Sequence, residues 1–209
     1  MCIIKKIQLY HQEDAKACRM FFISVSYRIF GHCLVHLIKS HFKDVLLEVV
    51  SYKEVALEHL QPYNRIIFSP GPQLPQDYPI LYDILKTYDT QIPILGICLG
   101  HQAICNYYGA AIRHLGRVVH GESSLISCDP TSLLFKGMNT AVVGRYHSWA
   151  AYDIPNTLRI TAKTADDVVM AVEHKHKAVF GVQFHPESVI SNCGVDIIRH
   201  FIYDVRTNR

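Results

Sequence analysis

The chain has 209 residues, a length that fits one well-buried domain and is short for two. Hydrophobic residues make up 49% of it and charged residues 19%, which is a globular composition and argues against disorder. The formal charge of +3 is small and no cluster of Lys and Arg is interleaved with aromatic residues, so we expect no nucleic-acid partner. The apolar runs are short and interrupted by polar residues, so we expect no membrane span.

The cysteines indicate a reducing compartment. Their number is odd, they are scattered, and no two form a C-x-x-C pair, so neither a disulfide framework nor a zinc site is expected. The N-terminus has a short apolar patch that soon turns charged, which makes a poor signal peptide. We therefore expect a cytoplasmic protein. The cysteines are Cys2, Cys18, Cys33, Cys98, Cys105, Cys128 and Cys193.

In the first half of the chain, short β-type runs alternate with helical patterns. Apolar residues recur at helical spacing in the longer segments, and the short runs are rich in β-branched and aromatic residues. Such an alternation predicts a parallel sheet with right-handed crossovers. The expected strands are 20–26, 44–50, 65–69 and 92–98, and the expected helices are 31–42, 77–88 and 99–109.

From Ala111 to Phe184 the pattern changes, because β-type runs follow one another with turns between them. This succession predicts antiparallel strands added to one end of the sheet. An amphipathic helix over 194–202 then closes the chain. The expected strands of this half are 123–127, 140–148, 158–164, 168–174 and 178–184.

Cys98 lies between two glycines in "GICLG", directly after the apolar run 92–98 and before the helix 99–109. This is the layout of a nucleophile elbow with Cys in place of Ser, in which small residues are needed two positions on either side. A thiol at a helix N-terminus is favoured as thiolate, and the N–H of Leu99 can face an oxyanion. A buried structural cysteine beside two incidental glycines would leave the same pattern.

Two further stretches favour the catalytic interpretation. In "GVQFHPES", His185 and Glu187 are two residues apart, so in extended chain they point the same way and the carboxylate can orient the imidazole toward Cys98. In "SPGP", Gly71 allows its backbone N–H to approach a substrate closely, as an oxyanion hole requires. Together the pieces predict a Cys-His-Glu triad; taken singly, each is compatible with an ordinary turn or surface pair.

At this point the sequence resembles the triad-type, or class I, glutamine amidotransferases over roughly residues 44–203. The resemblance implies an α/β fold with a mostly parallel central sheet, helices on both of its faces and an antiparallel β extension. It implies no cofactor, and because the histidines have no Cys or carboxylate neighbours at ligand spacing we expect no metal. The matching motifs are Ser69-Pro70-Gly71-Pro72, Gly96-Ile97-Cys98-Leu99-Gly100-His101-Gln102 and Phe184-His185-Pro186-Glu187-Ser188.

By the same resemblance, Cys98 attacks the side-chain amide of L-glutamine and His185 transfers the protons, with Glu187 as the third member. The backbone N–H groups of Gly71 and Leu99 stabilise the oxyanions. The residues that this resemblance places around the glutamine are Gly71, Pro72, Gln73, Leu99, Gln102, Ser148 and Trp149. For Tyr146 and His147 the alternative interpretation is ordinary packing, and for Trp149 packing and substrate binding stay equally open.

The stretches "GRYHSW" (144–149) and "HGESS" (120–124) resemble the branch of the family that serves chorismate enzymes. The resemblance therefore implies a hetero-oligomer with a chorismate-binding synthase subunit, either as anthranilate synthase component II or as the small subunit of aminodeoxychorismate synthase. Two other classes stay open: a stand-alone γ-glutamyl hydrolase with the same triad, and a binding relative without catalysis.

The N-terminal part departs from the family pattern. Residues 1–19 have no counterpart, so we divide the chain into an N-terminal extension (1–19) and an amidotransferase domain (20–209). The family's Asp-Asn-Tyr-Asp-Ser-Phe stretch is replaced by "ISVSYRIFGH" (23–32). Gln73 stands where the family usually has glycine, and a negative φ would accommodate it.

Overall fold

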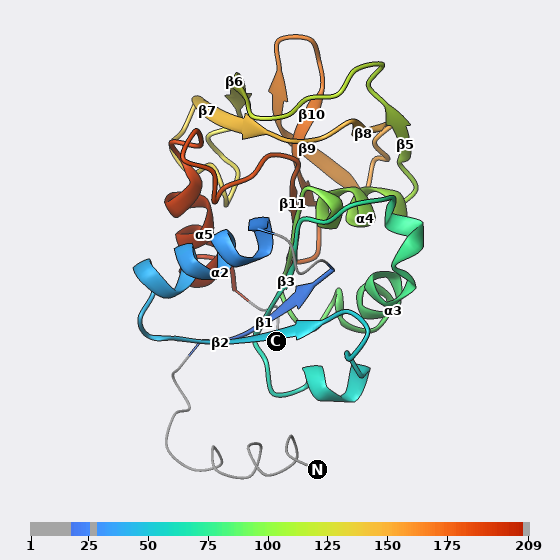
Figure 1. Cartoon of the computed structure of the whole chain (residues 1–209), viewed down its shortest axis with the longest axis vertical. Coiled ribbons are helices and arrows are strands. Elements are labelled where there is room, and N and C mark those ends of the chain that lie inside the picture. The colour runs from blue at the N-terminus through green and yellow to red at the C-terminus, as the bar shows by residue number, and fades with distance from the viewer. Residues whose placement is uncertain (1–17, 26–28, 207–209) are drawn as a thin grey trace.

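The structure of the protein is a computed structural model that describes residues 18–25 and 29–206, with only the backbone described for Ile29 and Phe30. Its strands form one nine-stranded sheet in the order β2-β1-β3-β4-β11-β10-β9-β6-β7 and a two-stranded sheet of β5 and β8, counted over these residues. Figure 1 shows β1, β2 and β3 at one end of the molecule and β6, β7, β9 and β10 at the other.

The first half of the large sheet is parallel. β1 pairs with β2 and β3, β3 pairs with β4, and β4 pairs with β11, all in parallel register. β11 is the last of the described strands in chain order and lies beside β4, so two segments that are distant in sequence meet at the centre of the sheet. These strands are β1 (Cys18–Ser24), β2 (Val45–Ser51), β3 (Arg65–Phe68), β4 (Ile94–Ile97) and β11 (Val179–Val182).

The second half of the sheet is antiparallel, which confirms the predicted extension. β10 pairs with β11 and β9, and β6 pairs with β9 and β7. The expected strand 140–148 is wrong in its last residues, since β7 ends at Arg145 and a separate strand begins at Trp149. The strands are β5 (Ala111–His114), β6 (Glu122–Cys128), β7 (Thr140–Arg145), β8 (Trp149–Tyr152), β9 (Leu158–Thr164) and β10 (Val169–His174).

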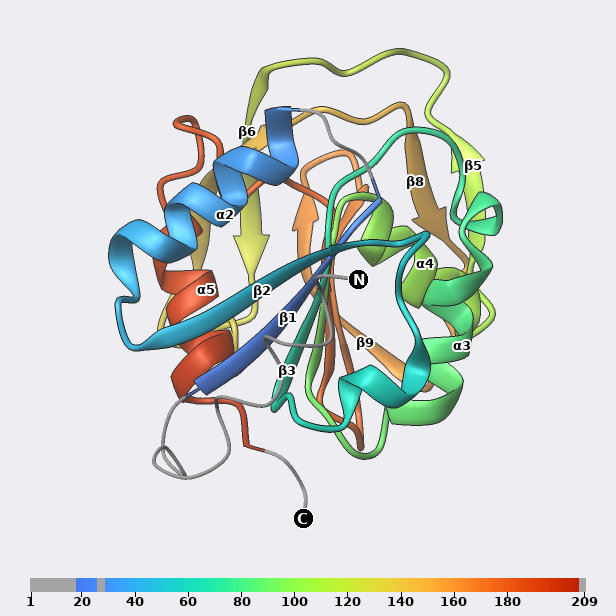
Figure 2. The same ribbon diagram turned by 60° about the horizontal axis from the view of Figure 1, so that its bottom comes forward.

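Helices cover both faces of the parallel half, as expected. Helices α2 and α5 lie on one side of β1–β3, and α3 and α4 lie on the other (Figure 2). The α-helices are α2 (Ile29–His41), α3 (Pro79–Tyr88), α4 (Leu99–Tyr107) and α5 (Gly194–Tyr203), and two short 3-10 helices span Leu57–Leu60 and Pro75–Asp77. Among the described residues, no helix has both the length and the apolarity that a membrane crossing requires.

The central strands are apolar throughout because each face of the sheet has its own core. Along β1, Met20 and Phe22 belong to the core under α2 and α5, whereas Phe21 and Ile23 belong to the core under α3 and α4. Successive side chains of a strand point to opposite faces, so a strand covered on both sides must be apolar at every position. Full burial of side chains of this size contributes about 1.5–3 kcal/mol each.

The first strand begins slightly earlier than expected. Cys18 already lies in register with Val45 on β2, so β1 starts two residues before the boundary drawn between 19 and 20. Residues 1–17 of the expected extension, and Ser26 of the expected strand, lie outside the described residues. The division of the chain at this boundary stays a prediction.

Gln73 adopts a backbone conformation that the sequence analysis did not expect. Its φ is +67°, so the expectation of a negative φ is wrong. The family's glycine would adopt this left-handed conformation without strain, whereas for a residue with a Cβ it costs about 1–2 kcal/mol. The Gln73 side chain offsets little of this cost, since its amide oxygen accepts one long hydrogen bond, 3.4 Å, from the Tyr78 hydroxyl.

We therefore predict that Gln73→Gly raises the free energy of unfolding by about 0.5–1 kcal/mol, since relief of strain exceeds the gain in entropy of the unfolded chain. Gln73→Ala is the matched control, because it removes the same side chain and keeps the strain. Urea denaturation of the three proteins measures the difference. Equal stability of the Gly and Ala variants would contradict a strained backbone at this position.

Candidate active site

Cys98 is the sharp turn between β4 and α4. Strand β4 ends at Ile97, the helix begins at Leu99, and Cys98 between them has φ 52° and ψ −100°. A residue with a Cβ in such a region costs about 1–3 kcal/mol, and strain of this kind gathers at functional sites. The predicted elbow is therefore present, with the thiol at the N-terminus of a helix that starts one residue later.

The two flanking glycines are required by close packing. A Cβ at Gly96 would lie 2.3 Å from the carbonyl carbon and oxygen of Gly100. A Cβ at Gly100 would lie 2.6 Å from the Cβ and the carbonyl oxygen of Phe68 on β3. Both contacts involve backbone that cannot move away cheaply. The first turn of α4 thus lies directly on strands β3 and β4, and this close approach forms the elbow.

His185 reaches Cys98 because β11 is the parallel neighbour of β4. The N–H of Cys98 donates to the Val182 carbonyl at 2.8 Å, so the two strand ends are side by side. Cys98 and His185 also interact electrostatically, an interaction that favours the charged form of the imidazole. The imidazole Nδ1 of His185 lies 2.7 Å from Oε1 of Glu187. Cys98, His185 and Glu187 are thereby brought together at one edge of the sheet, as the sequence analysis expected.

The geometry of the His185–Glu187 pair differs from the expected one. The segment is a turn and not extended chain, closed by the N–H of Ser188 donating to the His185 carbonyl at 3.1 Å. The Ser191 hydroxyl donates to the same carbonyl at 2.6 Å. A Cβ at Gly194 would lie 1.8 Å from the Pro186 carbonyl oxygen, so the start of α5 presses against the turn. Packing, rather than strand periodicity, aims the carboxylate at the imidazole.

The electrostatics of the pair favour a charged imidazole. Burial opposes the charge, but the electrostatic interaction with Cys98 and the hydrogen bond to Glu187 outweigh it and raise the pKa of His185 to about 10. His185 is 2% exposed, Cys98 6% and the Glu187 side chain 2%, so solvent screens the three groups little. The site therefore favours an imidazolium at His185, and an imidazolium beside a cysteine is an arrangement that can activate the cysteine as a nucleophile.

A second Cys-His pair, within helix α4, favours the neutral forms of both side chains. Sγ of Cys105 lies 3.6 Å from Nε2 of His101, and both residues are fully buried. Burial lowers the pKa of His101 to about 3 and raises the pKa of the Cys105 thiol, so both stay neutral. Within the described residues, no three His, Cys, Asp or Glu side chains lie close enough to hold a metal ion.

The predicted oxyanion residues are neighbours. A Cβ at Gly71 would lie 2.2 Å from Cγ2 of Val25 and 2.9 Å from Cδ2 of Leu99. The loop after β3 therefore runs against the start of α4, where the first N–H groups have no partner inside the helix. The absence of a side chain at Gly71 is what permits this approach.

The predicted glutamine-binding residues come from three elements. Gln102, on α4, donates through Nε2 to the Trp149 carbonyl at 3.0 Å. The Ser148 carbonyl accepts from the N–H of Leu115 at 2.8 Å. On the other side of Cys98, the Pro72 carbonyl accepts from the Tyr78 hydroxyl at 3.1 Å, in the loop where Gln73 also lies. The structure thus links Gln102 directly to Trp149. Ser148 is held by its own hydrogen bond to Leu115, and the loop of Pro72 and Gln73 is held by Tyr78.

Several buried polar residues of the site were not assigned a role from sequence. Arg145 and His147 are 3% and 5% exposed and hydrogen-bonded to each other, and Gln183 is fully buried. The Tyr146 ring lies 5.0 Å from the His185 ring, and its hydroxyl lies 3.2 Å from Oγ of Ser188. The signal was present in the sequence, since "GRYHSW" and "GVQF" place polar residues at the ends of apolar strands.

Comparisons with known proteins agree with this geometry. The crystal structure of a candidate GMP synthase protein from Thermoplasma acidophilum superposes with a TM-score of 0.80 at 21% identity, covering 89% of this chain and 92% of that one. A glutamine amidotransferase from Thermotoga maritima superposes with a TM-score of 0.66 at 17% identity, covering 81% and 76%. At these identities the likeness establishes the fold.

Sequence comparison establishes the family. "Anthranilate synthase component II" of Haloarcula marismortui is 38% identical over 186 residues, which is 87% of this chain and 96% of the relative. The family model of class-I glutamine amidotransferases matches residues 26–205. Spanning most of the chain and containing the Cys98 elbow, this match shows that the protein belongs to the class-I glutamine amidotransferase family and is a glutamine amidotransferase.

Proposed function

We propose that Cys98, His185 and Glu187 are the catalytic triad with which this chain hydrolyses L-glutamine, and that the ammonia is delivered to a chorismate-binding synthase subunit. The observation that carries the proposal is the buried hydrogen bond of His185 with Glu187, together with the electrostatic interaction of His185 with Cys98, at the ends of two adjacent parallel strands. It gives a nucleophile, a proton-transferring base and a group that orients the base.

The first half of the reaction releases ammonia. The Cys98 thiolate attacks the side-chain amide carbon of glutamine, and the negative charge moves to the amide oxygen. The N–H groups of Gly71 and Leu99 stabilise this oxyanion, a type of contact worth about 3–4 kcal/mol in the transition state. The His185 imidazolium gives its proton to the amide nitrogen, the carbon–nitrogen bond breaks, and ammonia leaves a γ-glutamyl thioester on Cys98.

The second half regenerates the enzyme. His185, now neutral, takes a proton from water, and the hydroxide attacks the thioester carbon. The same N–H groups hold the second oxyanion. Its collapse expels the Cys98 thiolate and yields glutamate, with His185 again charged. Glu187 stabilises the imidazolium at both ends of the cycle, which agrees with the raised pKa of His185.

Glutamine is held by the loops around Cys98 in this proposal. Pro72 and Gln73 form one wall with Gly71, and Gln102, Ser148 and Trp149 form the other. The Trp149 carbonyl already accepts from Gln102 and His147, and the Ser148 carbonyl accepts from Leu115. Since both carbonyls are occupied, this stretch is left to offer N–H donors, which suit the carboxylate of the substrate.

The partner we favour is the synthase subunit of anthranilate synthase, because the relative from Haloarcula marismortui carries the name of component II. A second candidate is the aminodeoxychorismate synthase partner. A relative from Bacillus subtilis, named "Aminodeoxychorismate/anthranilate synthase component 2", is 36% identical over 153 residues, which is 72% of this chain and 78% of the relative. A cytoplasmic location suits the free cysteines of the described residues, Cys33 among them, which is exposed.

The first test separates the nucleophile from the partner's chemistry. Cys98→Ser should reduce glutamine-dependent product of the reconstituted synthase by at least about 10³-fold, because a hydroxyl is not ionised at this position. Product formed from ammonium salts should be unchanged, since only the ammonia source lies on this chain. Cys33→Ser is the matched control and should behave as the wild type. Retained glutamine-dependent activity in Cys98→Ser would overturn the assignment of the nucleophile.

The second test ranks the other two members of the triad. His185→Ala should lower glutaminase kcat/KM by about 10²–10⁴-fold, because the proton-transferring group is lost. Glu187→Gln should lower it less, since an amide oxygen can still accept the Nδ1–H of His185 while the stabilising charge is removed. Steady-state kinetics measure both. An inactive Glu187→Gln beside a nearly normal His185→Ala would contradict these roles.

The third test addresses partner control. The isolated chain should be a weak glutaminase that accelerates when its chorismate-binding partner is added, because a site made of loops from β3, β7 and β11 can be completed by docking. Glutaminase rates with and without that partner measure this. A maximal rate in the isolated chain, together with hydrolysis of γ-glutamyl peptides, would favour a stand-alone hydrolase instead.

A further inference from the structure

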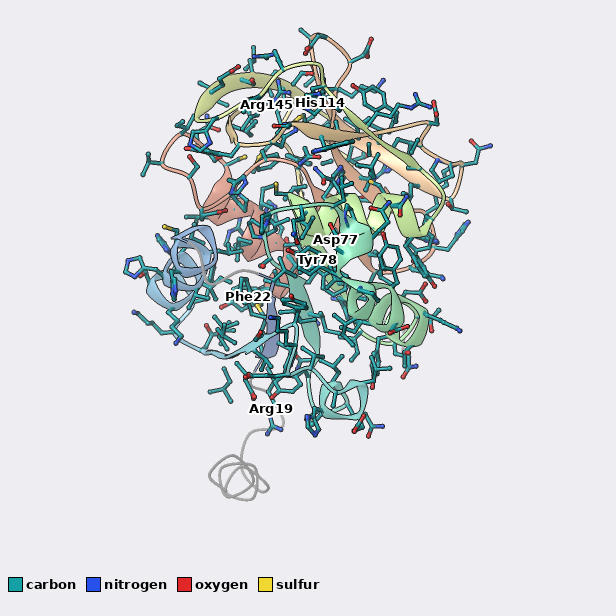
Figure 3. All side chains as sticks on the ribbon, turned by 45° about the vertical axis from the view of Figure 1, so that its right-hand side comes forward. Arg19, Phe22, Asp77, Tyr78, His114 and Arg145 are labelled. Carbon is teal, nitrogen blue, oxygen red and sulfur yellow. The ribbon has the colours of Figure 1, made fainter. Side chains whose placement is uncertain are left out.

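The segment that joins β7 to β8 carries a buried cation beside the proposed active site. Arg145 ends β7 and is 3% exposed, and His147 is 5% exposed. Figure 3 shows Arg145 in the antiparallel part of the molecule, far from Arg19 at the start of β1. Among the described carboxylates, none lies within salt-bridge distance of Arg145; the charges that act on it are those of Asp166, Arg117 and Glu122.

A buried guanidinium without a direct carboxylate is costly, so the hydrogen bond that it does make is informative. Nε of Arg145 donates to Nε2 of His147 at 3.0 Å. A guanidinium has no acceptor, so Nε2 must be the acceptor nitrogen of a neutral imidazole and the proton must be on Nδ1. Burial lowers the pKa of His147 to about 4, with the nearby Arg145 charge acting in the same direction, so the ring stays neutral.

Because its proton is on Nδ1, His147 donates the next hydrogen bond of the series through that nitrogen. Nδ1 of His147 lies 2.9 Å from the Trp149 carbonyl oxygen, which therefore accepts from it. The same oxygen accepts from Nε2 of Gln102 at 3.0 Å, and that nitrogen also donates to Oε1 of Gln183 at 3.1 Å. Both N–H bonds of the Gln102 amide are thereby used. Gln102 can turn only its oxygen toward a ligand.

We infer that Arg145 and His147 are positioning residues for glutamine: through a one-way chain of hydrogen bonds they hold the Trp149 carbonyl and, with it, the side-chain amide of Gln102. The inference rests on the proposed function, since it concerns how the same site holds its substrate. This chain of hydrogen bonds joins β7, β8, α4 and the segment after β11. It therefore fixes the substrate side of the site relative to the elements that carry Cys98 and His185.

The hydrogen-bond chain sets the geometry of substrate binding and does not include the proposed triad. None of its hydrogen bonds involves Cys98, His185 or Glu187. Loss of the donor at position 147 should therefore weaken substrate binding and spare the chemical step. This separation distinguishes a positioning role from a merely structural one, in which the apparent kcat would fall with the folded fraction while KM stayed the same.

The kinetic test uses a matched pair of substitutions. His147→Asn keeps an N–H donor at the place of Nδ1, whereas His147→Leu has a similar size and no donor. We expect the KM for glutamine to rise about ten-fold in His147→Leu, the effect of one lost hydrogen bond, with kcat within about two-fold of wild type. In His147→Asn the KM should stay within about two- to three-fold. An unchanged KM in His147→Leu, or an equal rise in both variants, would overturn the inference.

A spectroscopic test stands apart from activity. Nitrogen-15 NMR of the histidine rings should show His147 of the wild type as the Nδ1–H tautomer at neutral pH, and in Arg145→Met the Nε2 resonance should shift because that nitrogen loses its hydrogen-bond donor. An Nε2–H tautomer in the wild type, or an unchanged Nε2 resonance in Arg145→Met, would contradict the inference. If the wild type lacked glutaminase activity, the proposed function would fail, and this measurement would still decide the hydrogen-bond chain. The NMR measurement also tests the inference in the case that His147→Leu does not fold, because it does not use that variant.

Discussion

The site depends on one steric constraint, the contact of the first turn of α4 with the strands beneath it. Gly100 lies so close to Phe68, and Gly96 so close to Gly100, that a methyl group at either position would overlap backbone. This contact forces Cys98 into a strained conformation and leaves its thiol at the carboxyl end of the sheet. The cost of that strain, about 1–3 kcal/mol, is offset by the two cores that clamp the central strands.

The second constraint is the topology of the sheet, which brings together residues that are far apart in sequence. β11 is the last strand of the chain and inserts between the parallel half and the antiparallel half, directly beside β4. His185 follows β11 as Cys98 follows β4, so the two strands carry the proposed nucleophile and the proposed base to the same edge. Because the site is buried, the electrostatic interactions of His185 with Cys98 and Glu187 are little screened by solvent.

Much of this could be predicted from the sequence, because the motifs are local and their physical requirements strict. The elbow around Cys98 needs its two glycines, and the alternation of apolar runs and helices specifies the parallel half. The left-handed φ of Gln73 and the turn at His185–Glu187 could not be predicted, because both are set by distant contacts: the loop after β3 lies against α4, and Gly194 presses on Pro186.

The sequence marks the polar residues at the ends of the strands, but it could not show how their hydrogen bonds connect. Arg145, His147 and Gln183 are spread over two segments, and only the pairing of strands shows that their hydrogen bonds converge on the Trp149 carbonyl and Gln102. The central claim, that Cys98 is an activated nucleophile for glutamine, is tested most directly by an electrophilic glutamine analogue and peptide mass spectrometry. The account predicts one covalent adduct, on Cys98, that glutamine protects against and that His185→Ala slows. An adduct on the exposed Cys33, or none at all, would contradict it.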